Sequence, residues 1–156
     1  MSGVRKQWLI VGLGNTLRGD DALGALVIRS LRPLVDSESV RLMECAAVTP
    51  ELAATLAAVD LAVFIDASQN GPIGRIECQL LESETGGLPF THGCGIAALP
   101  ELARQLYGRA PTVYLLTARG GSFDLHDGRL SPATEAMVRP MVERTLALLA
   151  DDGRDR

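Results

Sequence analysis

Short apolar runs alternate with stretches of helical spacing along most of the chain. Three of these runs, Trp8 to Val11, Leu61 to Ile65 and Thr112 to Leu116, have the length of buried strands. Val40 to Cys45 alternates in part and is typical of a further strand. Arg75 to Leu81 alternates like an edge strand, and we expect it to run antiparallel to its neighbour.

Helical patterns separate these strands. Prolines mark their limits, because Pro suits a first helical turn and disturbs a helix interior. We therefore expect the first helix to end near Pro33, Pro100 to kink or restart its helix, and Pro140 to break or kink the last helix. The helices are predicted at Ala25 to Leu31, after Thr49-Pro50-Glu51, at Ile96 to Tyr107, and after Ser131-Pro132. Strands that alternate with helices predict a three-layer α/β fold, with a twisted, mostly parallel sheet of about five strands and helices on both faces.

Length and composition narrow the class of protein. The 156 residues predict a single domain over residues 1–150, followed by a frayed charged tail at 151–156. The net charge of −4, with scattered basic residues, argues against a nucleic-acid binder. The apolar runs are too short for a membrane span, and residues 1–6 are too polar to start a signal peptide. Three widely spaced cysteines favour a reducing cytoplasm over a disulfide framework.

A glycine-rich stretch, GLGNTLRGDDALG from Gly12 to Gly24, joins the first strand to the first helix. It lacks the third glycine of a dinucleotide-binding turn, because Leu17 stands there. Asp20 and Asp21 replace the lysine and hydroxyl of a phosphate-binding loop, so phosphate would be repelled and we expect no nucleotide cofactor. The two aspartates either cap the following helix or bind a cation.

Two more residues are expected at the same edge of the sheet. Asp66 follows the run Leu61 to Ile65, and His92 lies between a polar loop and a helix start. Ligands of doubly wound sheets bind beyond the carboxyl ends of the strands, where Asp66 and the loop carrying Asp21 both belong. Two carboxylates and one imidazole form a mixed O/N site that suits a borderline divalent ion with open coordination positions.

Other chemistries have weaker support. Cys94 and His92 could form a nucleophilic pair, but no third group to orient them is evident, so Cys94 is interpreted as a neighbour of the site. Cys45 and Cys78 fall in strands and are expected to be inert, and His126 lies in a polar turn and is expected to be solvated. The sequence contains no HExxH, GxSxG or CxxC motif, which argues against a self-contained zinc peptidase.

The chain resembles the maturation endopeptidases of nickel–iron hydrogenases. The stretch from Gly12 to Gly24 resembles their N-terminal signature, in which a strand leads to Gly-x-Gly-Asn, an acidic pair and a glycine inside the first helix. Asp66 in VFIDAS and His92 before the next helix stand where that family has an aspartate and a histidine. The segment from Gly128 to Pro132 resembles the family's entry to its last helix, so the similarity spans nearly the whole chain.

The resemblance implies an activity. Family members are cytoplasmic endopeptidases that remove a short C-terminal extension from the hydrogenase large-subunit precursor after nickel insertion, and they recognise the nickel held by the precursor's cysteines. Carried over by position, the catalytic and nickel-contacting residues would be Asp21, Asp66 and His92. The nickel would then arrive with the precursor. The supporting positions around this set are Gly14, Asn15, Asp20, Thr91 and Cys94.

Two alternative functions use the same features differently. A nickel-sensing or escort protein would keep the same ligands and bind the precursor without cutting it. An ordinary nucleotide-binding domain would be stabilised by nucleotide, which the acidic loop argues against. Detection of a cleaved precursor would distinguish the endopeptidase from the escort, which leaves the precursor uncut.

Overall fold

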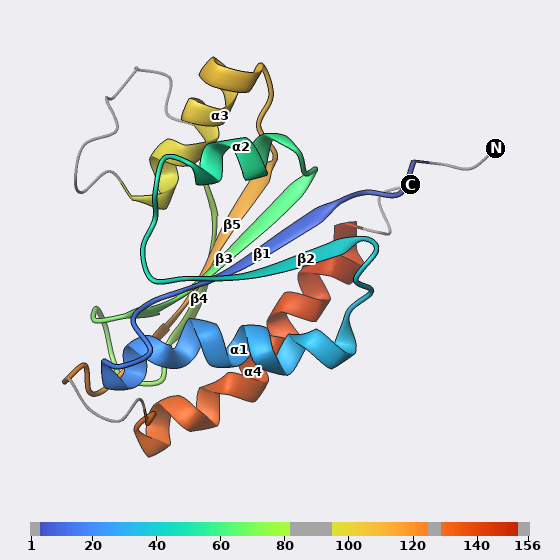
Figure 1. Ribbon diagram of the computed structural model, residues 1–156. Coiled ribbons are helices and arrows are strands. Elements are labelled where there is room, and N and C mark those ends of the chain that lie inside the picture. Colours follow the sequence, from blue (N-terminus) through green and yellow to red (C-terminus); the bar gives the residue numbers. More distant parts are fainter. Residues whose placement is uncertain (1–3, 82–94, 125–128, 153–156) are drawn as a thin grey trace.

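The fold is a five-stranded sheet between two layers of helices (Figure 1). The computed structural model describes residues 4–81, 95–124 and 129–152. The strands are β1 (Trp8–Leu13), β2 (Val40–Cys45), β3 (Leu61–Ser68), β4 (Ile76–Leu81) and β5 (Thr112–Arg119). The α-helices are α1 (Leu23–Leu31), α2 (Leu52–Ala57), α3 (Leu99–Tyr107) and α4 (Pro132–Asp152). Short 3-10 helices span Gly19–Ala22, Arg32–Leu34 and Ile96–Ala98.

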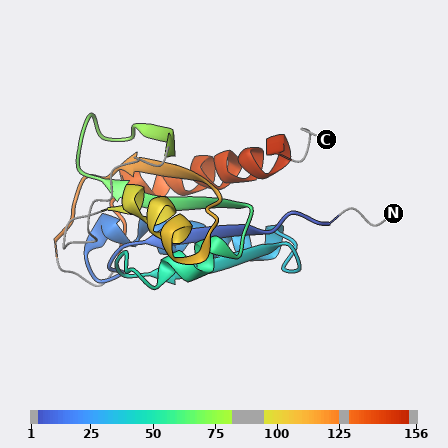
Figure 2. The ribbon, with the colours of Figure 1, turned by 90° about the horizontal axis from the view of Figure 1, so that it is seen from above.

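The strand order is β2-β1-β3-β5-β4. The pairs β1 with β2, β1 with β3 and β3 with β5 are parallel, and β4 pairs antiparallel with β5 at the sheet's edge. Helices α1 and α4 cover one face, and α2 and α3 cover the other (Figure 1). Figure 2, the same ribbon seen from above, has α2 and α3 nearest the viewer. The three-layer fold and the antiparallel edge strand predicted from the sequence are both confirmed.

The two faces of the sheet carry separate apolar clusters. Ile10 and Val63 pack on the side of α1 and α4, whereas Leu9 and Phe64 pack on the side of α2 and α3. All four side chains are fully buried, which explains why the central strands are almost uninterrupted apolar runs. Because alternate residues of a strand share a face, Asp66 lies on the same face as Phe64, beneath α2 and α3.

Two strands extend beyond their expected ends. The apolar run of β3 was expected to end at Asp66, but the strand continues to Ser68, and Asp66 pairs in register with Thr117. The neighbouring strand β5 likewise continues to Arg119 and offers backbone partners over that whole length. Asp66 is therefore held within a strand, so its position is set by sheet hydrogen bonding.

The prolines have different consequences. Pro100 lies in the first turn of α3, directly after the 3-10 helix Ile96–Ala98, so the predicted restart is confirmed. Pro140 was expected to break or kink the last helix; the break is absent, because α4 continues from Pro132 to Asp152. A proline in a helix interior costs about 3 kcal/mol through its missing N–H and its steric clash, and burial of Met137 and Met141 on either side offsets this cost.

Helix α4 also continues past the expected boundary of the tail. It ends at Asp152, where the Asp152 carboxylate accepts a hydrogen bond from Lys6 Nζ at 2.9 Å. Residues 153–156 lie outside the described residues. No helix in the described part of the chain is both long and apolar enough to cross a membrane.

Candidate active site

Two glycines bring the acidic loop against the sheet. Gly14 has a φ of +129°, a region that favours glycine, and a Cβ there would collide with the Asp21 carbonyl oxygen. A Cβ on Gly24 would lie 2.6 Å from the Leu13 carbonyl oxygen and 2.8 Å from that of Ile65. Helix α1 therefore approaches β1 and β3 closely, and this approach fixes the 3-10 helix Gly19–Ala22 at their carboxyl ends.

Asp20 is fully buried and ties that 3-10 helix to the segment between β5 and α4. Its Oδ2 accepts hydrogen bonds from the backbone N–H groups of Gly121 (2.6 Å) and Ser122 (2.8 Å). The Ser131 N–H donates to Oδ1 at 2.6 Å, and the Ser131 hydroxyl donates to Oδ2 at 2.8 Å. Burial alone would raise the pKa of Asp20, but these hydrogen bonds outweigh it and the pKa is lowered. Asp20 is thus an ionised structural clamp.

Asp21, the next residue, lies close enough to Asp66 for their charges to interact. Burial raises the pKa of Asp66 to about 6, the negative charge of Asp21 adds to the rise, and the hydrogen bond from the Ala67 N–H opposes it. That bond is 2.9 Å long, and Asp21 Oδ2 accepts a 2.6 Å bond from the Asn15 N–H. The two carboxylates bring negative charge together in a half-buried place. A bound cation or a proton would reduce the repulsion between them.

The structure places the other predicted site residues to different extents. Gly14 and Asn15 both support Asp21, the first by admitting its backbone and the second by donating to its carboxylate. Thr91, His92, Cys94 and His126 lie outside the described residues. Gly95, three residues after His92 in the sequence, lines the same pocket as Asp66.

A metal-binding set is only partly present in the described ranges. Within residues 4–81, 95–124 and 129–152, no group of three or more histidine, cysteine or acidic side chains could hold a metal ion. Cys45 and Cys78 are free, and burial raises the pKa of both thiols, as expected of inert thiols in strands. The described part of the site therefore consists of the carboxylates of Asp21 and Asp66, called the acid pair below.

A pocket of about 430 Å³ opens beside Asp66 on the α2 and α3 side of the sheet. Its polar lining residues in the described chain are Asp66 itself and Gln79 of β4. Its apolar walls come from Leu13, Val48, Leu81, Ile96, Ala97 and Leu115. Apolar walls with a few polar groups are typical of ligand-binding pockets.

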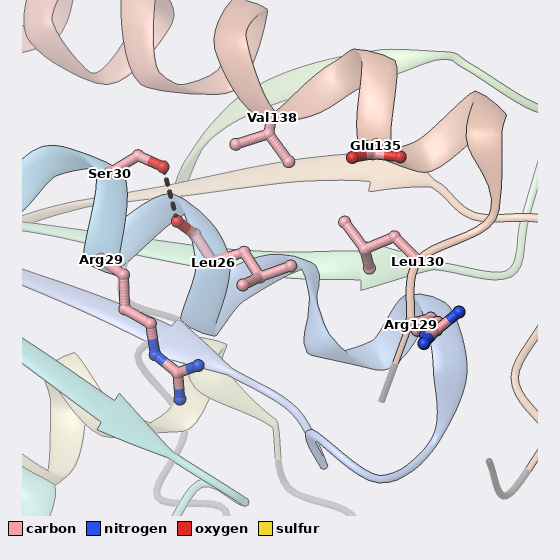
Figure 3. Close-up of a pocket in the computed structure, with 7 residues that line it drawn as sticks. All are labelled: Leu26, Arg29, Ser30, Arg129, Leu130, Glu135 and Val138. Atoms are coloured by element: carbon pink, nitrogen blue, oxygen red, sulfur yellow. Dashed lines mark hydrogen bonds between the residues drawn. The ribbon is translucent and has the colours of Figure 1, made fainter. Parts of the chain in front are cut away.

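A larger hollow of about 580 Å³ lies elsewhere, between α1 and the start of α4. Figure 3 shows Leu26, Leu130 and Val138 directed into it, with Arg29 and Glu135 at its margins. Arg29 is already bonded to the Glu44 carboxylate, at 2.8 Å from Nη2. None of the predicted site residues that the structure describes lines this hollow, so size alone does not identify the site.

Sequence reasoning missed the partners of Asp20. Ser131 was expected only as the residue before the last helix, and neither Gly121 nor Ser122 was singled out from the sequence. The signal in the sequence was a second aspartate, Asp20, together with glycines and serines in the segment before the last helix. The backbone N–H groups of such a segment can donate to a carboxylate. Their meeting depends on tertiary contacts across more than half of the chain.

The chain was compared with known proteins. No family model matches it. It is 26% identical over 151 residues to the hydrogenase 2 maturation protease of Escherichia coli strain K12, which covers 93% of this chain and 92% of that protein.

Solved structures agree with this relationship. The hydrogenase maturating endopeptidase HybD of E. coli superposes with a TM-score of 0.77 at 24% identity, covering 94% of each chain. The nickel–iron hydrogenase maturation protease HycI of Thermococcus kodakarensis KOD1 superposes with a TM-score of 0.69 at 27% identity, covering 96% of this chain and 93% of the other. The first of these supports the fold, and the second adds sequence similarity along nearly the full length. Together, the fold and these relatives show that the chain is similar to hydrogenase maturation endopeptidases along nearly its full length.

Proposed function

We propose that this endopeptidase removes a C-terminal extension from the large-subunit precursor of a nickel–iron hydrogenase. The observation that carries the proposal is the pairing of Asp21 with Asp66 at the carboxyl edge of the sheet, in a chain similar to hydrogenase maturation proteases. The names of these relatives favour a protease over a non-cutting escort. The cytoplasm is the compartment that the sequence resemblance implies, and the free thiols of Cys45 and Cys78 suit a reducing environment.

Nickel enters this proposal as part of the substrate, held by the precursor's cysteines. The acid pair fits such an ion, because carboxylate oxygens bind divalent metals and a cation would offset both the burial of Asp66 and the nearby charge of Asp21, the two causes that raise the pKa of Asp66. His92 would add an imidazole nitrogen, a ligand that suits nickel. Asp21, Asp66 and His92 would thus contact the metal and position the scissile peptide next to the acid pair.

The reaction is peptide hydrolysis. The oxygen of a water molecule attacks the scissile carbonyl carbon, and a carboxylate of the acid pair accepts the proton of that water. A carboxyl group with a pKa of about 6 is suited to this exchange near neutral pH. The same proton then passes to the nitrogen of the leaving peptide. The products are a new C-terminal carboxylate on the large subunit and a released peptide with a free amine.

The test is the intact mass of the precursor, nickel-loaded and nickel-free, before and after incubation with this protein. We expect loss of a C-terminal peptide from the loaded form only. Asp21→Asn, Asp66→Asn and His92→Ala should abolish cleavage and leave the fold intact. Glu143→Gln, which changes an exposed acid on α4, is the matched control and should cleave normally.

Other outcomes would contradict the proposal. Cleavage at the control rate by both aspartate variants would remove the acid pair from the reaction. Equal cleavage of the nickel-free precursor would remove the metal requirement. An unchanged mass of a correctly paired, nickel-loaded precursor would favour the escort.

A further inference from the structure

We infer that Ser131 is a positioning residue for the reaction: through its hydrogen bonds to Asp20, it holds the adjacent Asp21 in place at the acid pair. This inference rests on the proposed function and adds to it a residue that lies outside the acid pair. Ser131 directly precedes the last helix, and the proposed chemistry does not otherwise use it.

Ser131 donates to both oxygens of the Asp20 carboxylate. Its backbone N–H lies 2.6 Å from Oδ1, and its hydroxyl oxygen lies 2.8 Å from Oδ2. Asp20 is fully buried, so water does not compete for these bonds. Gly121 and Ser122 donate through their backbone N–H groups, and both donate to Oδ2. Among these donors, Ser131 is therefore the residue whose side chain fixes the orientation of the carboxylate.

The hydroxyl group of Ser131 is itself held in place. It is hydrogen-bonded at 3.1 Å to the hydroxyl of Thr134, a fully buried residue in the first turn of α4. The carbonyl oxygen of Ser131 accepts a bond from the N–H of Glu135, as expected of the residue at which a helix begins. Ser131 thus ties Asp20 to a helix of 21 residues. A regular element is a firmer support for a site residue than a loop.

The same contacts limit where Asp21 can lie. Asp20 and Asp21 are adjacent in the 3-10 helix before α1, so their Cα atoms are about 3.8 Å apart. The N–H of Asp20 also donates to the Ser122 carbonyl at 2.8 Å, so Asp20 is held through its backbone and its side chain. The Asp21 carboxylate accepts a 2.6 Å bond from the Asn15 N–H. A shift of Asp20 would therefore move Asp21 relative to both Asn15 and Asp66.

A role limited to capping α4 predicts a different result for one substitution. Aspartate caps a helix about as well as serine does, and threonine does so nearly as well. A hydroxyl can donate to Asp20, whereas an aspartate at residue 131 would place a second carboxylate against it. Ser131→Asp therefore keeps the cap and loses the hydroxyl donor, Ser131→Ala loses both, and Ser131→Thr keeps both.

The experiment measures cleavage of the nickel-loaded precursor and the NMR chemical shift of the Asn15 amide proton. Ser131→Asp and Ser131→Ala should lower kcat about tenfold or more, because the acid pair is misplaced. KM should change less, since Asp66 and His92 still contact the metal. The short bond to Asp21 deshields the Asn15 proton, so its resonance should move upfield in both variants. Ser131→Thr should keep the wild-type kcat and chemical shift.

Ser39→Ala is the matched control. The Ser39 hydroxyl also bonds an aspartate carboxylate, Asp36 Oδ2 at 3.2 Å, but it does so just before β2, at the opposite end of the sheet. This variant should leave kcat, KM and the Asn15 chemical shift unchanged. Thermal melts identify any variant that does not fold. If Ser131→Asp is among them, the comparison of Ser131→Ala with Ser131→Thr tests the inference.

The inference is overturned when Ser131→Asp and Ser131→Ala keep the kcat and the Asn15 chemical shift of the Ser39→Ala control. It is also overturned when Ser131→Asp behaves as the wild type and Ser131→Ala alone is impaired, because capping then accounts for the residue. A precursor that the wild-type chain does not cut contradicts the proposed function separately. The Asn15 chemical shift then tests the positioning of Asp21 by itself, because it requires no cleavage.

Discussion

Burial is the larger cause of the raised pKa of Asp66, and the carboxylate of Asp21 adds to the rise, although the two residues come from different elements of the fold. Asp21 lies in the 3-10 helix before α1, and Asp66 lies within the central strand β3. Two like charges in a half-buried place repel each other, so the pair is unfavourable unless a proton or a cation binds there. Such pairs are common at functional sites. The first two predictions follow from this pair.

Replacing Asp21 by asparagine should lower the pKa of Asp66. The pKa should stay above its ordinary value of about 4, because burial is the larger cause of the rise and persists in the variant. A carboxyl-carbon NMR titration of Asp66 measures this change directly. Asp36→Asn, an exposed acid near the opposite end of the sheet, is the control and should leave the titration unchanged. An unaltered pKa in Asp21→Asn would show that the two carboxylates do not interact.

Asp66→Asn should stabilise the metal-free protein near neutral pH. The folded pKa of about 6 lies above the unfolded value of about 4, so the folded state loses stability from this group as pH rises between them. Asparagine removes that penalty, and its side-chain oxygen can still accept the Ala67 N–H. The gain should reach about 1–3 kcal/mol at pH about 7 and disappear below pH about 4.

Urea unfolding of the wild-type chain and of Asp66→Asn at both pH values checks this prediction. A variant that is less stable than the wild type at neutral pH would show that Asp66 supports the fold. It would also weaken the case that Asp66 is kept for function.

Asp20→Ala should destabilise the fold strongly, in contrast to Asp21→Ala. It leaves the N–H groups of Gly121, Ser122 and Ser131 without their acceptor, at a cost of about 3–5 kcal/mol. Asp21→Ala removes one bond, that from the Asn15 N–H, and should abolish processing with a much smaller loss of stability. Denaturation and cleavage assays on the two variants separate the roles of these adjacent acids.

The contribution of Asp20 should also depend on pH. Its folded pKa is lowered, so its stabilisation is complete above the unfolded value of about 4 and is lost as pH falls through the folded value. The stability difference between the wild type and Asp20→Ala should therefore shrink in acid. A constant difference from neutral pH to strong acid would mean that Asp20 is not an ionised clamp.

Gly24→Ala should weaken both stability and processing. The new methyl group would meet backbone atoms of Leu13 and Ile65, which cannot move aside as a flexible side chain can. Overpacking of this kind costs about 1–3 kcal/mol, and it would move α1 away from the strand that carries Asp66. Thermal melts and the precursor-cleavage assay measure the two effects. Gly95→Ala is the stability control, because a Cβ there meets no atom within 4 Å and should leave the melting temperature unchanged.

Much of the fold was predictable from residue patterns. The run from Leu61 to Ile65 is wholly buried, and the alternation of β4 identified an antiparallel edge strand. The limits of the elements were less predictable. Strand β3 continues through Asp66 because β5 offers it partners, and α4 tolerates Pro140 because the methionines on either side are buried. Both outcomes depend on neighbours that are distant in the sequence or on the opposite side of an interface.

The sequence by itself determined that an acidic loop and Asp66 meet at one edge of a parallel sheet. That prediction needs only a parallel sheet, because the carboxyl ends of its strands lie at one edge. Only the tertiary structure decided how the adjacent acids divide their roles. Asp20 is held by backbone donors from residues 121–131, and Asp21 is left beside Asp66. Local sequence treats two neighbouring aspartates alike, and the division arises from the donors that folding brings to one of them.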